Sequence, residues 1–95
     1  MTAFLVELYV AQSNAGAVRR DAERARLAAE ALSREGTPVR YLQSIFVPAD
    51  ETCFHLCEAG SADAVREVIR RADLSVGRVS EVVAEPSDDQ EEQSR

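Results

Sequence analysis

The sequence predicts an α+β domain in which a four-stranded antiparallel sheet carries two helices on one face. Three observations support this. Four short segments are β-like, the first of them with apolar residues at a period of two; apolar residues recur with helical spacing in two other segments; and turn residues such as Gly, Pro and Ser separate the segments. The resulting order, β-α-β-β-α-β within residues 1–84, is typical of the ferredoxin-like fold.

The first predicted strand covers residues 4–10. An entirely apolar row alternates there with a mixed row that includes Glu7 and Tyr9. The stretch has no basic leader and is far shorter than the roughly 20 apolar residues of a membrane-spanning helix. We therefore expect a strand of a cytoplasmic protein rather than a targeting or membrane segment.

The first predicted helix follows a turn at 11–16, in which Ser13 or Asn14 is available as the N-cap. Its apolar stripe consists mostly of alanine and continues to Leu32, and Gly36 is the expected stop signal. Because alanine is small, this helix can lie close to the sheet. Its opposite side carries charged residues and reads as a solvated face.

Strands two and three are predicted at 39–47 and 52–58, joined by a short turn at 48–51 that contains Pro48. Strict alternation would divide strand two into two fairly apolar rows. One row is Val39, Tyr41, Gln43 and Ile45, and the other is Leu42, Ser44 and Phe46. Both sides of this strand are therefore expected to be covered.

The second helix is predicted to begin at an N-cap, Ser61, and to bury an apolar stripe that ends at Ala72. A last strand follows at 79–84. Residues 85–95 carry five acidic residues and no large apolar side chain, so we expect a disordered acidic tail. The predicted organisation is one ferredoxin-like domain, 1–84, followed by this tail.

Composition narrows the functional classes. The 95 residues include 11 basic and 17 acidic side chains, giving a formal net charge of −6 and a pI of about 4.7. Such a chain has no general attraction to nucleic acid or to an anionic membrane, so neither is expected as a partner. Only 5% of residues are aromatic. A core built largely of alanine buries little apolar area, and we therefore expect a homodimer formed through the open sheet face.

Three segments carry a resemblance to a known family. Residues 41–59, 61–66 and 77–82 read YLQSIFVPADETCFHLCEA, SADAVR and GRVSEV. They resemble a bacterial family catalogued as domain of unknown function 4242, and the resemblance runs from the first predicted strand to the last. Its members are short ferredoxin-like chains that form homodimers, and some actinobacterial members bind nickel. The resemblance thus implies a dimer and an association with metal.

The nickel-binding members carry histidines just after strand one and near the end of helix two. Here these regions, 9–13 and 70–74, read YVAQS and RRADL and contain no His. Imidazole and thiolate ligands are thus missing at both places. We therefore carry no metal-binding residue over from the family, expect weak nickel affinity, and leave the cofactor unknown.

One chemically suggestive cluster lies on strand three, where two cysteines and a histidine alternate with apolar residues. Alternation directs the three polar side chains to one face, and we expect Phe54 and Leu56 to face the helices. In the usual ferredoxin-like order, strand one lies beside strand three. The predicted ligand-binding set on the open face is Glu7, Tyr9, Cys53, His55 and Cys57.

Strand geometry limits what this cluster can do. Residues four apart on a strand are separated by about 13 Å, so Cys53 and Cys57 cannot form a disulfide and are expected to be free thiols. One metal ion cannot gather all three strand-three groups. Three interpretations stay open: packing in a dimer interface, which we favour, a small-ligand pocket, and a metal site. In a pocket, His55 beside Glu7 would be an oriented general base.

Two function classes follow. The first is a non-enzymatic binding module, because the chain has no nucleophile motif, Gly-rich phosphate loop or paired-carboxylate signature. The second is a small dimeric α/β-barrel enzyme in which open sheet faces enclose an apolar small molecule and His55 or Tyr9 transfers a proton. The second rests mainly on analogy of fold, which does not determine function.

Overall fold

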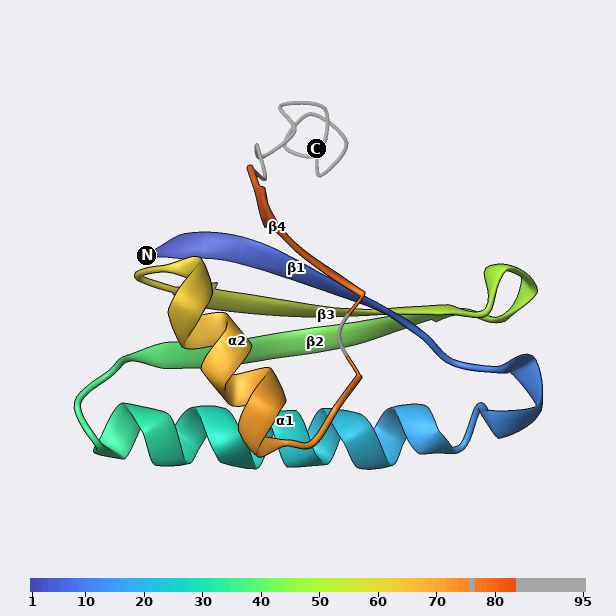
Figure 1. The fold of residues 1–95 in the computed structure, drawn as a ribbon, viewed down its shortest axis with the longest axis horizontal. Helices are drawn as coiled ribbons and strands as arrows, with labels where there is room; N and C mark the ends of the chain where they lie inside the picture. Colours follow the sequence, from blue (N-terminus) through green and yellow to red (C-terminus); the bar gives the residue numbers. More distant parts are fainter. Residues whose placement is uncertain (76, 84–95) are drawn as a thin grey trace, which may run out of the picture.

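The computed structural model describes residues 1–75 and 77–83 (Figure 1). Its helices and strands are β1 (Thr2–Tyr9), α1 (Ala17–Arg34), β2 (Val39–Val47), β3 (Thr52–Ala59), α2 (Ala62–Arg71) and β4 (Arg78–Val82), with short 3-10 turns η1 (Gln12–Asn14) and η2 (Pro48–Asp50). This order confirms the predicted β-α-β-β-α-β arrangement. The predicted acidic tail and its boundary with the domain lie outside the described residues.

The four strands form one antiparallel sheet in the order β2-β3-β1-β4. The two central strands, β1 and β3, come from opposite halves of the chain, and β2 and β4 form the edges. Both helices pack on the same face, since their apolar residues join a single core cluster with those of β1. The predicted ferredoxin-like fold is therefore confirmed.

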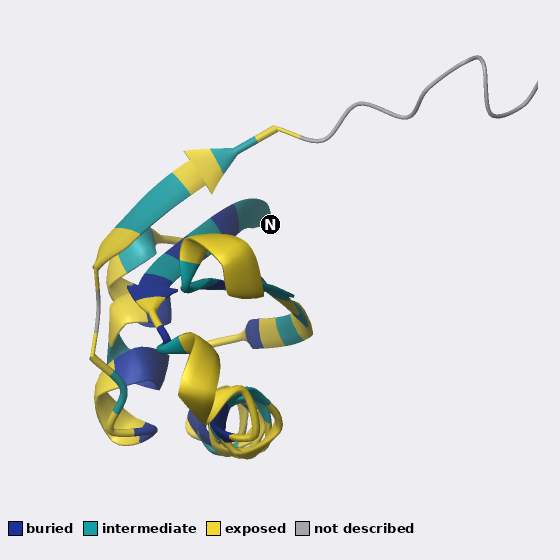
Figure 2. Cartoon of the chain, turned by 90° about the vertical axis from the view of Figure 1, so that its right-hand side faces the viewer, coloured by how far each residue is buried: buried dark blue, intermediate teal, exposed yellow. Residues whose placement is uncertain are grey.

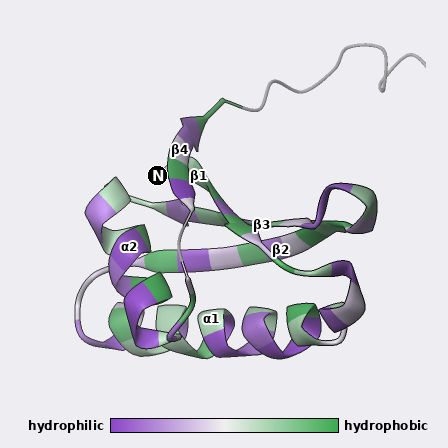
Figure 3. Ribbon diagram, turned by 45° about the vertical axis from the view of Figure 1, so that its right-hand side comes forward, coloured by the Kyte–Doolittle hydropathy of each residue, from purple (hydrophilic) through white to green (hydrophobic). Residues whose placement is uncertain are grey.

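Helix α1 begins later than the sequence predicts. Its N-cap is Gly16, which makes no side-chain capping hydrogen bond, and the predicted caps Ser13 and Asn14 lie in η1 instead. The prediction was wrong because a full 3-10 turn separates the strand from the helix. The C-terminal prediction is confirmed, since Gly36 has a φ of 106° and the chain leaves the helix there. Figure 3 shows hydrophobic and hydrophilic residues side by side along α1, as in an amphipathic helix.

Helix α2 is capped as predicted, because the Ser61 hydroxyl accepts a hydrogen bond from Ala64 N at 3.2 Å. Its buried side consists of Ala64, Val65, Val68 and Ile69. Asp63 in the first turn and Arg70 in the last suit the helix dipole. Among the described residues, no helix combines the length and the apolar character that crossing a bilayer requires.

The core fills the space between the helices and one face of the sheet, where Figure 2 shows the buried residues gathered. The sheet contributes Phe4, Val6 and Leu8 from β1, and α1 contributes mainly alanines. The small side chains of α1 let it lie close to the sheet, along β2 in Figure 1.

Strand β2 contains a bulge that changes its predicted faces. The register shifts between Tyr41 and Gln43, which leaves Leu42 as the extra residue opposite β3. Tyr41 is paired with Cys57, and Ser44 is paired with His55, so both face the helices although strict alternation had put them on opposite sides. The bulge thus creates a helix-facing row that the sequence pattern does not show.

The other face of the sheet has no helix over it. Its centre is apolar and partly exposed, with cross-strand neighbours Leu5 and Leu56, and Phe54 beside Ile45. Two charged pairs border this centre: Arg40 with Glu58 beyond its end, and Glu7 with Arg78 beside Phe54 in the same cross-strand row. We call the apolar centre, Leu5, Ile45, Phe54 and Leu56, the open-face patch.

Candidate functional site

The strand register places the cluster of β3 in the core. Cys53, His55 and Cys57 lie opposite Leu8, Val6 and Phe4 of β1, and all six are buried beneath the helices. The prediction that the two cysteines and the histidine occupy the open face was therefore wrong. Phe54 and Leu56, which were expected to face the helices, form part of the open-face patch instead.

The physical reason is that cysteine behaves as a small hydrophobic residue and is readily buried. A buried histidine is tolerated where both of its ring nitrogens have partners. Those partners come from Cys53 on the same strand and from Tyr41 on β2. Sequence reasoning missed Tyr41, because it placed His55 on the open face and because the bulge changes which later residues of β2 share the row of Tyr41.

The buried triad, as we call Tyr41, His55 and Cys53, has a defined geometry. The Tyr41 phenol oxygen lies 2.6 Å from His55 Nδ1, and Cys53 Sγ lies 3.8 Å from His55 Nε2. The rings of Tyr41 and His55 are tilted by 50°, with centroids 5.6 Å apart. No buried side-chain nitrogen or oxygen atom in the described ranges lacks a hydrogen-bond partner. The triad is thus a satisfied polar network within an apolar core.

Two tautomers of His55 can satisfy this network. In one, the Tyr41 hydroxyl donates to Nδ1 and the Nε2 proton is directed at the Cys53 sulfur. In the other, Nδ1–H donates to the phenol oxygen and the Cys53 thiol donates to Nε2. Both arrangements keep the imidazole, the phenol and the thiol neutral, and they differ in which ring nitrogen of His55 carries the proton.

Burial governs the protonation of all these groups. It lowers the pKa of His55, an effect that the carboxylate of Asp21 on α1 opposes. Burial also raises the pKa of Tyr41 to about 12 and that of Cys57 to about 11. The pKa of Cys53 is raised by burial first and by Asp21 second. The core therefore favours neutral imidazole, phenol and thiols at neutral pH.

The cysteines do not form a disulfide. Cys53 and Cys57 are both free, which confirms the prediction from strand spacing. Within 1–75 and 77–83, no group of three or more His, Cys, Asp or Glu side chains is arranged to hold a metal ion. Enclosure also separates the thiols and the imidazole from anything bound on the open face.

The other two predicted residues line a surface cleft. This hollow, of about 330 Å³, lies where β1 ends beside the β2–β3 turn and the start of β4. Its lining residues are Glu7, Leu8, Tyr9, Asp50, Glu51, Thr52, Gly77 and Arg78. Tyr9 is 70% exposed, and Glu7 lies 3.9 Å from Arg78. The predicted set of five is thus split between the cleft and the core.

Backbone contacts hold the cleft in place. The Gly77 N–H donates to the Glu7 carbonyl at 2.9 Å, and a Cβ at Gly77 would lie 2.6 Å from that oxygen. Glu51, with a φ of 49°, accepts from Gln12 N through its carboxylate at 2.8 Å and from Val10 N through its carbonyl at 3.0 Å. Thus one cleft carboxylate is already engaged in fixing the start of η1.

Comparison with known proteins gives three findings. A solved structure, "Crystal structure analysis of SCO4226 from Streptomyces coelicolor A3(2)", matches with a TM-score of 0.69 and 27% sequence identity, covering 88% of this chain and 99% of that one. No curated protein matches the chain. The family model described as "Nickel responsive protein SCO4226-like" matches residues 9–82. The predicted resemblance to a family with nickel-associated members is thereby supported, and the chain belongs to the SCO4226-like family of nickel-responsive proteins.

Proposed function

We propose that this protein is a non-enzymatic binding module of the nickel-responsive family and that it works as a homodimer. The observation that carries the proposal is the enclosure of its reactive groups. Cys53, His55 and Cys57 are fully buried, and the surface cleft is lined by carboxylates, hydroxyls and Arg78 instead. An acid-base group must come within hydrogen-bond reach of the proton it transfers. Enclosed groups of this kind favour binding over catalysis.

The alternative function, a dimeric α/β-barrel enzyme, has His55 or Tyr9 transfer a proton to a substrate enclosed by the open sheet faces. Tyr9 lies in the open-face row of β1, next to Thr52, while His55 lies in the buried row of β3. The sheet itself stands between the two side chains. His55 is therefore separated from a substrate on the open face, and Tyr9 is the one residue of the two that lies on that face.

A second copy of the chain is the occupant that best fits the open-face patch. The patch is apolar at its centre, and each flanking pair, Arg40 with Glu58 and Glu7 with Arg78, contains both signs of charge. A two-fold interface brings the same surface of both subunits together, so a surface with both charges at its rim can be complementary to itself. Burying the patch would also add apolar area to a core that is rich in alanine.

Nickel does not fit the side chains of one subunit. Nickel sites in proteins commonly use imidazole or thiolate ligands, and the only histidine of the chain is buried beside the buried Cys53. Three or more suitable ligands do not converge anywhere in the described residues. We therefore propose that this member takes part in the nickel response without a tight nickel chelate within one subunit.

A small-molecule partner and a cytoplasmic location stay predictions. The cleft is where we place a small polar ligand, because it is the hollow that contains Glu7 and Tyr9 from the predicted set.

The nickel part of the proposal is tested by calorimetric titration of untagged protein with Ni²⁺. We expect weak heats without a defined stoichiometry, and the same result for His55→Gln. Tight, stoichiometric binding that survives His55→Gln would show that other side chains form a nickel site. Tight binding abolished by His55→Gln would instead place nickel in the core. Either tight result contradicts the proposal.

A further inference from the structure

Two soft donor atoms face one another in the core. Cys53 Sγ and His55 Nε2 are 3.8 Å apart, and both residues are fully buried. Metal bonds to sulfur and to imidazole nitrogen measure about 2.3 and about 2.0 Å for zinc, so one ion can bridge donors up to about 4.3 Å apart. A single ion therefore fits between these atoms with little movement of either side chain.

The surroundings limit such an ion to two protein ligands. Cys57 lies four residues from Cys53 on the same strand, a separation of about 13 Å between backbone positions. No third His, Cys, Asp or Glu completes a metal-binding group in the part of the chain that the structure describes. Thiolate and imidazole together suit soft ions, and soft monovalent ions such as Cu(I) accept two-coordinate geometry.

The net charge of the bound pair also favours a monovalent ion. A thiolate with a monovalent ion is neutral, whereas a thiolate with a divalent ion carries a net positive charge. An uncompensated charge in an apolar core is costly. The carboxylate of Asp21 acts on this pair from α1, but its residue is partly exposed and its charge is screened by water. The core therefore discriminates against divalent ions, nickel included.

Tyr41 would not contact the ion but would hold the His55 ring in the orientation that binding requires. Histidines that bind metals usually donate the other ring N–H to a fixed acceptor, which sets the tautomer and aims the lone pair at the ion. The Tyr41 phenol oxygen, 2.6 Å from Nδ1, is placed to accept that proton and leave Nε2 free.

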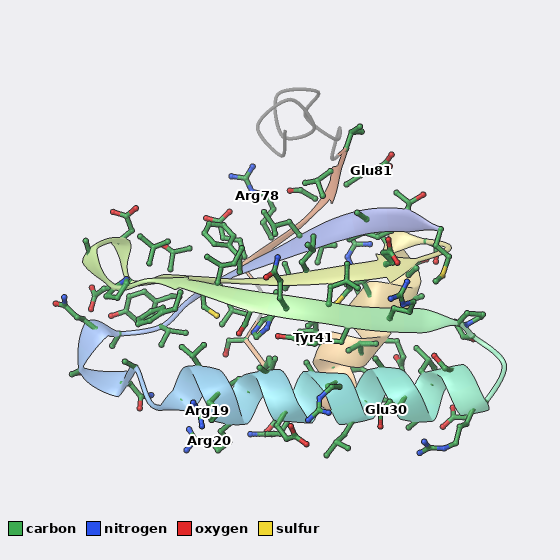
Figure 4. The ribbon with its side chains drawn as sticks, turned by 180° about the vertical axis from the view of Figure 1, so that it is seen from behind. Arg19, Arg20, Glu30, Tyr41, Arg78 and Glu81 are labelled. Atoms are coloured by element: carbon green, nitrogen blue, oxygen red, sulfur yellow. The ribbon has the colours of Figure 1, made fainter. Side chains whose placement is uncertain are left out.

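Tyr41 also lies on the route by which an ion would reach His55. It stands on the edge strand β2 and is only partly buried, and Figure 4 shows it between β2 and α1. A rotation of this one side chain would open a path to the His55 ring between β2 and α1.

We propose that Cys53 and His55 form a two-coordinate site for a soft monovalent metal ion of the Cu(I) class, with Tyr41 as the residue that orients His55. Binding forms one metal–sulfur and one metal–nitrogen bond and releases the Cys53 thiol proton to solvent, with no change of oxidation state. The site goes beyond the proposed function, because it concerns a different ion and a different face of the sheet.

The test is an anaerobic titration of untagged protein with Cu(I) in competition with a coloured Cu(I) chelator. The wild type should withdraw one equivalent per chain. Cys53→Ser should lose that equivalent, and Cys57→Ser should retain it. Cys57 is the matched control, since it is an equally buried free thiol on the same face of the same strand. Tyr41→Phe should weaken binding by roughly tenfold, as expected for a second-layer partner.

Failure of the wild type to compete would overturn the proposal, as would loss of the ion in Cys57→Ser or retention in a folded Cys53→Ser. X-ray absorption on the Cu(I)-loaded wild type keeps the test independent of whether a variant folds. One sulfur and one nitrogen neighbour is the expected result, and two sulfur neighbours would overturn it. Because the nickel calorimetry measures another ion, either proposal can fail without the other.

Discussion

The Tyr41 phenol oxygen lies 2.6 Å from His55 Nδ1 and joins the edge strand β2 to the centre of the core. The bulge at Leu42 puts Tyr41 and Ser44 on the same, helix-facing side of the strand. The contact explains how a fully buried histidine is satisfied beneath helices that contribute mainly alanine and aliphatic side chains. Tyr41 is therefore the residue whose removal should affect His55 most directly.

Removing the phenol hydroxyl should therefore destabilise the fold. Tyr41→Phe leaves His55 Nδ1 buried without its partner, and we expect the free energy of unfolding to fall by about 1–3 kcal/mol. Tyr9→Phe is the matched control, because Tyr9 is 70% exposed, and its effect should stay within about 0.5 kcal/mol. Urea unfolding of both variants measures the difference. Equal effects of the two changes would contradict the role assigned to the contact.

Stability should depend on pH through His55. Burial lowers its pKa below the ordinary value of 6.5, so the unfolded chain takes up the proton first as the pH falls. This contribution is fully present above pH 6.5 and is lost progressively as the pH falls from there to the lower pKa of the folded state. Subtracting the profile of His55→Gln removes the part due to carboxylates. A flat difference between pH 7 and pH 5 would show that His55 is not buried in solution.

The close approach at the cleft should make Gly77 intolerant of a side chain. In Gly77→Ala the new Cβ would meet the Glu7 carbonyl oxygen at 2.6 Å, and relieving this clash means moving backbone. We expect a loss of about 1–3 kcal/mol in the free energy of unfolding. Gly60→Ala is the control, because no atom lies within 4 Å of a Cβ placed there. Thermal unfolding that ranks the two variants equally would show that the β1–β4 junction is looser than described.

Deleting residues 86–95 should leave the melting temperature unchanged. The segment has no large apolar side chain and is rich in carboxylates, so it offers little area to bury. Circular dichroism of the shortened chain would check this. A loss of several degrees would mean that the segment docks on the domain.

The sequence predicts the fold well because its signals are local. Alternation identifies the strands, helical spacing identifies α1 and α2, and Ser61 marks the start of α2. Which face of β3 is buried is a different question, because its two rows, Cys53-His55-Cys57 and Phe54-Leu56, can each lie in a core. The answer depends on the long-range register with β1, where Val6 lies opposite His55.

The buried triad could not be predicted from the sequence either, because its contacts also depend on strand register. Tyr41 was assigned to a row by strict alternation, and a single extra residue, Leu42, changed which neighbours share its face. Histidine suggested a solvent-facing site, yet two partners from neighbouring positions are enough to bury it. In contrast, Glu7 and Tyr9 were correctly placed on the open side of β1, because the fully apolar row beside them could only be the core row.

Sedimentation equilibrium at micromolar concentration shows whether the open-face patch joins two copies of the chain. Leu56→Arg puts a charge into the patch, and Leu27→Arg puts the same charge on the outer side of α1, where Leu27 is 52% exposed. We expect a dimer for the wild type and for Leu27→Arg, and a folded monomer for Leu56→Arg. A monomeric wild type, or a Leu56→Arg variant that dimerises as tightly as the wild type, would contradict this expectation.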